Sequence, residues 1–267
     1  NSVKISGVSG IDGSKAVYGV YTDKDCTHKV GEITIGADGT GSIKLPNKQY
    51  YVKEISAPKG YDLSSDVVAL KANGSVNVEE NVTSGKITIN KTAEDGVVAD
   101  REFRISWTDN GKKHSKTAVT DKNGIAEFDG LHVYDFSTKG AISYTVSEVN
   151  TDSKYVTPKS QDITLTNGSA DLTVGVKFEN RLKKFKAEVK KTDSENNTTQ
   201  GDATLSGATY GLYRDGERIA TYTTDENGHF ITDEFVCGSY TLQELSPSKG
   251  YLLNDTIYKV GAEPQNY

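Results

Sequence analysis

Three glutamates recur in one local pattern, and each is a candidate for a buried carboxyl group with a chemical role. Glu54, Glu148 and Glu244 each follow a tyrosine by four residues and a valine or leucine by two, and each precedes a second tyrosine by seven. Residues of equal parity share one face of a strand, so each carboxyl group points the same way as these apolar neighbours. A buried carboxylate is costly unless it is protonated or paired. A single copy would be best explained as a solvated strand end, whereas three copies in one register indicate an internal role.

Two further polar residues of the middle segment share this inward parity. Lys91 ends the alternating run ITINK, and Asn180 ends the alternating run VGVKFEN near the close of the same segment. Because every second side chain of a strand points to the same face, both should face the apolar interior. We therefore expect Lys91, Glu148 and Asn180 to point into one core from a first, a middle and a last strand.

The elements that would position these residues belong to a threefold repeat. The boxes YYVKEISAPKGY, YTVSEVNTDSKY and YTLQELSPSKGY begin at Tyr50, Tyr144 and Tyr240. Apolar and polar residues alternate throughout, and no stretch sustains a period of 3.6 residues. Each unit has about the size of a small sandwich. We expect an all-β chain of three tandem β-sandwiches over residues 1–83, 84–183 and 184–267.

Clusters of Asp, Asn and Gly separate the alternating runs in each unit. We interpret GADGTG (36–41), TDKNG (120–124) and TDENG (224–228) as hairpin turns, since Asn and Gly tolerate the left-handed conformation. The latter two also look like fragments of a calcium loop, but they lack the further oxygen ligands and the distal glutamate. The four histidines show no metal-ligand spacing. We expect neither a metal nor another cofactor.

Composition and missing motifs limit the classes of function. The 267 residues include 31 Lys and Arg and 37 Asp and Glu, and the net charge of −6 disfavours a nucleic-acid partner. No apolar run approaches the length of a membrane span. The sequence holds no GxSxG or HExxH motif and no paired nucleophile and base, so we expect no enzyme. Cys26 and Cys237 fall in different units, which disfavours a disulfide; an internal thioester between Cys26 and Gln49 is a weaker alternative to a free thiol.

Taken together, these motifs resemble one known family. The K-T openings, ATYGLY (208–213), TDENG, the YxLxE…PxGY box and the closing VKFEN strand are similar to the Cna-B (SpaA-type) domains of Gram-positive surface adhesins and pilins. The resemblance covers the whole chain as three tandem units, strongly in the second and third and partially in the first. It implies transthyretin-like β-sandwiches that crosslink themselves through a Lys–Asn isopeptide bond.

In the middle unit the resemblance implies a bond between Lys91 and Asn180, with Glu148 as proton shuttle. An apolar environment favours the neutral amine, and folding holds it against the carboxamide. A protonated Glu148 would hydrogen-bond the amide oxygen and move protons while ammonia leaves. This is a single intramolecular reaction rather than turnover of a substrate. It would let a pulling force pass through covalent bonds.

The third unit keeps two of these three residues. Lys191 and Glu244 are present, but the spacing of 32 residues that separates Glu148 from Asn180 would place an asparagine beyond the chain. We expect that the bonding strand has been cut away and that Lys191 is free. Asn254 in a loop and the nearly terminal Asn266 are weaker candidates for its partner.

The first unit departs further from the pattern. Lys4 has outward parity, Gly7 occupies the inward place, and Glu80 stands where Asn180 would be. A bulge could bring Lys4 or Asn81 into play, but we expect no crosslink here. Glu54 then needs another partner or a wetter site.

The function that the resemblance implies is structural. We expect a stalk segment of a cell-wall-anchored adhesin or pilus outside the cell, with neighbouring domains of the same protein as partners and any host or matrix ligand bound by a tip outside this chain. The alternative is an adhesin module that binds a host or matrix molecule through an inter-domain groove or the long loop at 132–143, whose aromatic residues look exposed. A pilus-shaft subunit would need a sortase-reactive lysine and an LPxTG-like tail, and no such tail is visible.

Overall fold

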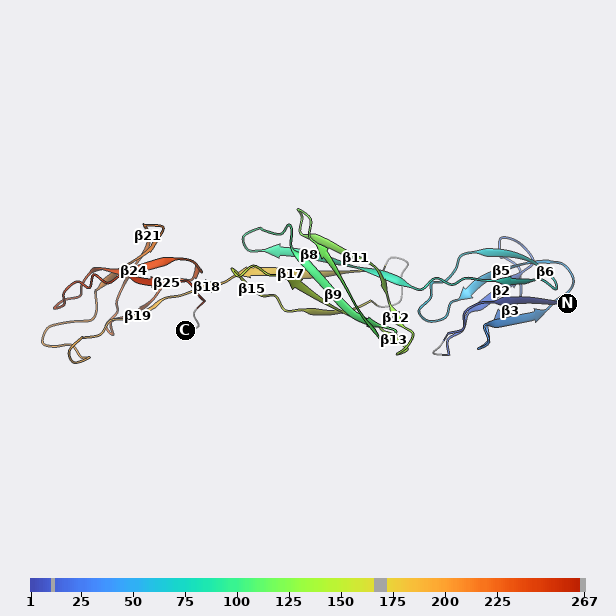
Figure 1. The fold of residues 1–267 in the computed structure, drawn as a ribbon, viewed down its shortest axis with the longest axis horizontal. Coiled ribbons are helices and arrows are strands. Elements are labelled where there is room, and N and C mark those ends of the chain that lie inside the picture. The colour runs from blue at the N-terminus through green and yellow to red at the C-terminus, as the bar shows by residue number, and fades with distance from the viewer. Residues whose placement is uncertain (11–12, 166–171, 265–267) are drawn as a thin grey trace. The chain divides into compact units, whose positions relative to one another are not determined.

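The chain folds into strands, turns and irregular segments around three hydrophobic cores. The computed structural model describes residues 1–10, 13–165 and 172–264 (Figure 1). The chain divides into two compact units, residues 1–92, 97–150 and 158–178, and residues 93–96, 151–157 and 179–267. Two of the cores lie in the first unit and one in the second. This confirms the predicted all-β chain of three sandwiches.

The first sandwich packs a three-stranded sheet against a four-stranded sheet. The smaller sheet has the order β4-β1-β7 and the larger the order β3-β2-β5-β6. The strands are β1 (Ser2–Ser6), β2 (Val17–Tyr21), β3 (Lys29–Thr34), β4 (Thr40–Lys44), β5 (Gln49–Ser56), β6 (Val67–Lys71) and β7 (Ser75–Asn77). Its core includes Val3, Ile5, Val20, Tyr50 and Val52, all at most 1 % exposed.

The middle sandwich is built from two four-stranded sheets. One has the order β11-β8-β17-β15 and the other β10-β9-β14-β16, with the short pair β12-β13 beside them. The strands are β8 (Ser84–Ala93), β9 (Glu102–Asp109), β10 (Lys112–Val119), β11 (Ile125–His132), β12 (Tyr134–Asp135), β13 (Gly140–Ala141), β14 (Ser143–Val149), β15 (Tyr155–Val156), β16 (Gln161–Thr164) and β17 (Thr173–Leu182).

The third sandwich keeps one four-stranded sheet, β21-β20-β24-β25, and two short pairs, β18-β23 and β19-β22. Its strands are β18 (Lys184–Phe185), β19 (Glu188–Lys190), β20 (Thr209–Arg214), β21 (Glu217–Thr223), β22 (His229–Ile231), β23 (Phe235–Val236), β24 (Tyr240–Ser246) and β25 (Tyr258–Val260). Among the residues that the structure describes, no helix is long and apolar enough to cross a membrane.

The recurring tyrosine of each box belongs to the core and also satisfies its hydroxyl group. The rings are at most 3 % exposed. Each hydroxyl donates to a backbone carbonyl: Tyr50 to Pro46 (2.9 Å), Tyr144 to His132 (2.7 Å) and Tyr240 to Val236 (2.9 Å). The buried hydroxyl groups therefore have protein acceptors and need no water as a hydrogen-bond partner. This explains why tyrosine recurs at this position.

The prediction of hairpin turns at 36–41, 120–124 and 224–228 is wrong. β10 pairs with β9, whereas β11 pairs with β8 in the other sheet, so the turn at 120–124 crosses between sheets. The carboxylate of Asp121 accepts the amides of Asn123 (2.8 Å) and Ile125 (2.9 Å), and Gly124 has a φ of +78°. The Asp–Asn–Gly cluster thus builds a carboxylate-stabilised corner. The hairpin between β9 and β10 instead turns at Asn110 and Gly111, both with positive φ.

Candidate functional site

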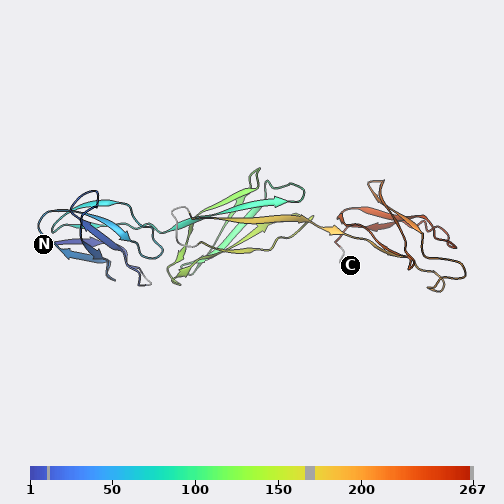
Figure 2. The ribbon, with the colours of Figure 1, turned by 180° about the vertical axis from the view of Figure 1, so that it is seen from behind.

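β8 and β17 lie side by side and parallel in the middle sandwich (Figures 1 and 2). The amide of Lys86 donates to the carbonyl of Leu172 (2.6 Å), and the amide of Glu94 donates to the carbonyl of Asn180 (3.0 Å). Both bonds join residues 86 apart in sequence, which is the pattern of two strands running in the same direction. The first and last strands of this sandwich are therefore neighbours.

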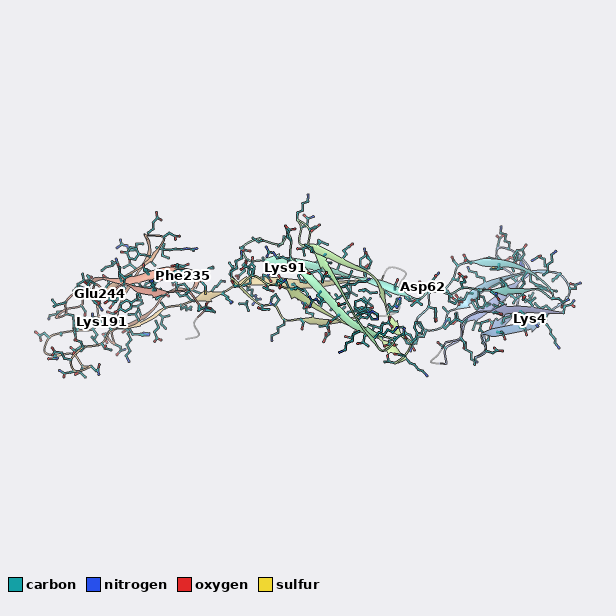
Figure 3. All side chains as sticks on the ribbon, viewed as in Figure 1. Lys4, Asp62, Lys91, Lys191, Phe235 and Glu244 are labelled. Atoms are coloured by element: carbon teal, nitrogen blue, oxygen red, sulfur yellow. The ribbon has the colours of Figure 1, made fainter. Side chains whose placement is uncertain are left out.

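Lys91 and Asn180 sit on these two strands as buried polar residues. Lys91 is 3 % exposed and Asn180 is fully buried, and Figure 3 labels Lys91 on β8. The ammonium of Lys91 donates to the carbonyl of Thr92 at 2.6 Å. A hydrogen bond from the Thr92 hydroxyl to the Phe178 carbonyl (3.5 Å) joins the two strands next to both residues. A buried amine and a buried carboxamide thus lie on adjacent strands.

Glu148 comes from the facing sheet. It lies on β14, where Phe103 of β9 is its cross-strand partner, and it is half-buried. On the same face of β14, Tyr144 and Val146 are fully buried, as the sequence pattern predicts. The rings of Phe103 and Phe178 meet edge to face at 5.0 Å. The apolar core therefore separates the site from water on the side of β9.

In the third sandwich, Lys191 and Glu244, both labelled in Figure 3, form a buried ion pair. The ammonium of Lys191 lies 2.9 Å from Glu244, with side chains 10 % and 1 % exposed. The other oxygen of Glu244 accepts the backbone amide of Asn254 at 2.7 Å. The Tyr251 ring lies 5.3 Å from the Lys191 ammonium. Lys191 is therefore paired with Glu244, and the expectation that no crosslink forms at Lys191 stays a prediction.

The edge of β19 beside this ion pair is open. β19 pairs with β22, and no described residue forms a strand along its other edge. A cleft of about 360 Å³ lies there, lined by residues of β19 together with Lys191, Asn254 and Tyr258. No counterpart of β17 is present among the described residues of this sandwich. Asn266, one of the two weaker candidates for the crosslink partner of Lys191, lies outside the described residues.

The first sandwich keeps the recurring glutamate as Glu54, but Gly7 and Glu80 stand at the places of Lys91 and Asn180. Lys4 is exposed, as its parity predicts. Glu54 is 2 % exposed and accepts the amide of Ser64 at 2.7 Å. The hydroxyl of Tyr18 donates to Glu80. Burial, with the charge of Glu80 as a further cause, raises the pKa of Glu54 to about 7. Of the two possibilities for Glu54, the structure supports another partner rather than a wetter site.

Sequence reasoning missed the acceptors of the second recurring tyrosine. The hydroxyl of Tyr155 donates to both carboxylate oxygens of Asp95 at 2.9 Å. In the third sandwich, Tyr251 donates to Asp193 at 3.1 Å. Each aspartate follows the K-T opening of its unit by a few residues. A comparison of the K-T openings of the second and third units for a shared aspartate would have found Asp95 and Asp193.

The aromatic residues of the 132–143 loop are not exposed, contrary to the expectation. Tyr134 is 5 % exposed. Phe136 is half-buried, and its ring centre lies 5.2 Å from that of Tyr134 and 5.1 Å from that of Tyr61. The insertion therefore packs its aromatic residues inside the first unit.

A groove of about 610 Å³ opens next to this loop, and Trp107, His114 and Asp162 contribute to its lining. The ring centre of Trp107 lies 5.3 Å from that of His114, with the rings stacked, and 5.3 Å from that of Tyr144, with the rings tilted. Trp107 is therefore packed against protein rings rather than standing free in the groove.

Neither a metal site nor a disulfide is found within residues 1–10, 13–165 and 172–264. No three His, Cys, Asp or Glu side chains are grouped to hold a metal ion in these ranges. Cys26 and Cys237 are both free thiols.

Comparison with protein families identifies the three sandwiches. The sequence model of the SpaA prealbumin-like fold domain matches residues 1–83, 85–180 and 185–266. The chain belongs to this SpaA family. The SpaA resemblance deduced from the boxes and openings is thereby confirmed, and so is the prealbumin-like sandwich that it implies.

Curated relatives of these SpaA domains are surface proteins of Gram-positive bacteria. Serine-aspartate repeat-containing protein D of Staphylococcus aureus (strain Newman) is 26 % identical over 267 residues, which covers 86 % of this chain and 20 % of the relative. The trypsin-resistant surface T6 protein of Streptococcus pyogenes serotype M6 is 27 % identical over 126 residues, covering 46 % of this chain and 23 % of the relative. The chain thus spans about a fifth of the length of these relatives.

A solved structure shares the fold. The Bacillus anthracis TIE protein aligns with a TM-score of 0.66 and 22 % identity, over 98 % of this chain and 48 % of that protein. This similarity supports the architecture of the SpaA domains and nothing finer.

Proposed function

We propose that this chain is a structural stalk segment of a cell-wall-anchored surface protein, and that its middle sandwich closes itself with an amide bond between Lys91 and Asn180. The observation that carries the proposal is the burial of an amine and a carboxamide on adjacent parallel strands, at 3 % and 0 % exposure. Homology to Gram-positive surface proteins supports the structural role. Its partners would be neighbouring domains of the same protein, with any host ligand bound elsewhere in it.

The proposed reaction needs no outside reagent. The neutral Nζ of Lys91 attacks Cγ of Asn180, a C–N bond forms, and the bond from Cγ to Nδ2 breaks. The carboxamide nitrogen leaves as ammonia, taking up the proton that the amine loses. Glu148 from the facing sheet would carry that proton and hydrogen-bond the developing oxyanion. Folding supplies the proximity of the two reactants.

The crosslink would give the stalk its mechanical property. The bond joins the first strand to the last, so tension applied through the chain ends would bypass the residues between Lys91 and Asn180. These residues would span about 300 Å if fully extended, at about 3.3–3.6 Å per residue. The strand hydrogen bonds of this sandwich would then carry little of the load.

Force spectroscopy on the full chain, held at its two ends, tests this proposal. We expect the fully extended wild-type chain to be shorter by about 300 Å than the Glu148→Gln variant. The exposed Glu127→Gln variant is the matched control and should behave as wild type. Equal extended lengths for wild type and Glu148→Gln would refute the mechanical role of the crosslink.

A ligand-binding adhesin module is the second candidate, and the groove beside residues 132–143 is the observation that favours it. Binding of a host or matrix molecule there should be reduced by His114→Ala, which removes one wall of the groove. Screening the full chain against matrix proteins, with this variant as control, tests the idea. If no matrix protein binds, or if binding is unaffected by the variant, this candidate fails.

A further inference from the structure

The first sandwich holds a polar cluster at the place of the crosslink site of the middle one. Glu54 on β5 is the cross-strand partner of Tyr18 on β2. In the middle sandwich, the corresponding glutamate faces Phe103, which has no hydroxyl group. The first sandwich therefore adds a phenol donor next to its buried carboxyl group.

This site has no room for the lysine that the middle sandwich uses. A Cβ atom built on Gly7 would lie 2.7 Å from Cγ2 of Val78, so the neighbouring valine already occupies the space of a side chain. The ammonium of Lys4 is on the exposed face of β1, which runs in unbroken register with β4. In the third sandwich, Lys191 neutralises the charge of Glu244. No lysine of β1 can do the same for Glu54.

The second carboxyl group comes from the segment after β7. β7 pairs in parallel with β1, just as β17 neighbours β8, and Glu80 follows this last strand of the sandwich by three residues. Tyr18 donates its hydroxyl to one oxygen of Glu80, and the amide of Ser64 donates to one oxygen of Glu54. The other oxygen of each, Glu54 Oε1 and Glu80 Oε2, is buried without a donor from the described protein atoms.

Two ionised carboxylates in this place would repel each other in a poorly solvated site. Both carboxyl groups lie at Tyr18, because Glu54 is its cross-strand partner and Glu80 accepts its hydroxyl, and each has one buried oxygen that lacks a donor. A shared proton removes the repulsion and supplies the missing donor for the two buried oxygens.

We propose that Glu54 and Glu80 form a proton-binding site that latches the last strand of the first sandwich to its core, in place of a covalent crosslink. One proton held between the two carboxyl groups joins β5 to the segment after β7 across the sandwich. Tyr18 positions Glu80 for this bond through its hydroxyl group.

The latch should weaken as the pH rises. Burial above all, and then the nearby Glu80, raise the pKa of Glu54 to about 7 in the folded state. A folded-state pKa above the unfolded value gives stability that is complete below about pH 4.5 and lost as the pH rises through about 7. The other charged groups lining the adjoining cavity, the exposed Asp66 and Glu79, are also acidic, so no basic side chain among the described residues lines it.

Two measurements on the full chain test the latch. Carbon-13 labelling of the glutamate carboxyl groups gives the titration midpoint of Glu54 by NMR. Hydrogen exchange gives the opening constant of the Val78 amide, which donates to the carbonyl of Ser6 at 2.9 Å. After correction for intrinsic exchange, we expect this constant to rise from pH 5 to pH 8 by a factor on the order of 10 to 100.

The Glu80→Gln variant separates the latch from ordinary packing. Glutamine keeps the size of the side chain and can donate an N–H to an ionised Glu54, so the opening constant of the Val78 amide should become nearly independent of pH. The exposed neighbour variant Glu79→Gln should keep the wild-type profile. A Glu54 midpoint at the ordinary glutamate value, or the same pH profile in Glu80→Gln as in wild type, would overturn the proposal. Neither readout depends on the Lys91–Asn180 crosslink.

Discussion

Replacing Glu148 by glutamine should separate the crosslink from the fold of the middle sandwich. Glutamine has nearly the same shape, so the core should form, but it cannot carry the proton that the reaction must move. Lys91 and Asn180 would then remain unjoined on their adjacent strands. The variant therefore removes the covalent bond and leaves both of its partners in place.

The magnitude follows from the loop that the bond closes. Lys91 and Asn180 bound a loop of 90 residues, for which the chain-entropy model of a crosslink gives about 4–5 kcal/mol. A domain of this size shifts its Tm by about 4–8 °C for each kcal/mol. The transition of the middle sandwich should therefore fall by about 16–40 °C in Glu148→Gln.

Calorimetry of the full chain, paired with intact mass on the same samples, is the assay. The transitions of the other two sandwiches should stay in place, and Glu127→Gln should change none of the three. If Glu148→Gln still loses ammonia, the role assigned to Glu148 is wrong. If it keeps its ammonia and its Tm is unchanged, the stability argument is wrong.

Two further substitutions test the other sites described above. Lys191→Met should lower the stability of the third sandwich by about 3–5 kcal/mol, because it leaves the Glu244 carboxylate buried without its cation; adding Glu244→Gln should recover much of the loss, and denaturant unfolding of both variants gives the comparison. Gly124→Ala should lower the free energy of unfolding of the middle sandwich by about 1–3 kcal/mol or more. The φ of Gly124 is +78°, and a Cβ atom would lie 2.4 Å from the carbonyl oxygen of Lys91. Gly96→Ala, at a φ of +75° in open space, is the control and should lower the free energy of unfolding by less. Equal losses in the two variants would refute the steric argument.

The sequence predicts the fold well because its signals are local and repeated. Strict alternation in the three boxes places each tyrosine and its aliphatic neighbour in the core, and the burial of Tyr144 and Val146 follows that pattern. The outward parity of Lys4 also holds. The alternation of side chains between two faces is a property of the single strand. It can therefore be predicted without knowing which strands are its neighbours.

Partners that come from distant segments could not be predicted in this way. The bond from Tyr18 to Glu80 joins residues 62 apart, and the pairing of Lys191 with Glu244 joins residues 53 apart. The corner at Asp121 was mistaken for a hairpin because both structures use the same Asp–Asn–Gly chemistry. Which sheet receives the next strand is decided by packing, which the turn residues do not encode.

The mass of the intact, denatured chain tests the central claim most directly. Our account predicts a mass lower than that of the sequence by one ammonia, and a proteolytic peptide in which Lys91 is joined to Asn180. Loss of a second ammonia would place a further crosslink in the first or third sandwich, against the carboxyl pair and the ion pair described there. The full mass of the sequence, measured on folded and then denatured protein, would contradict the crosslink and leave three sandwiches held by their cores alone.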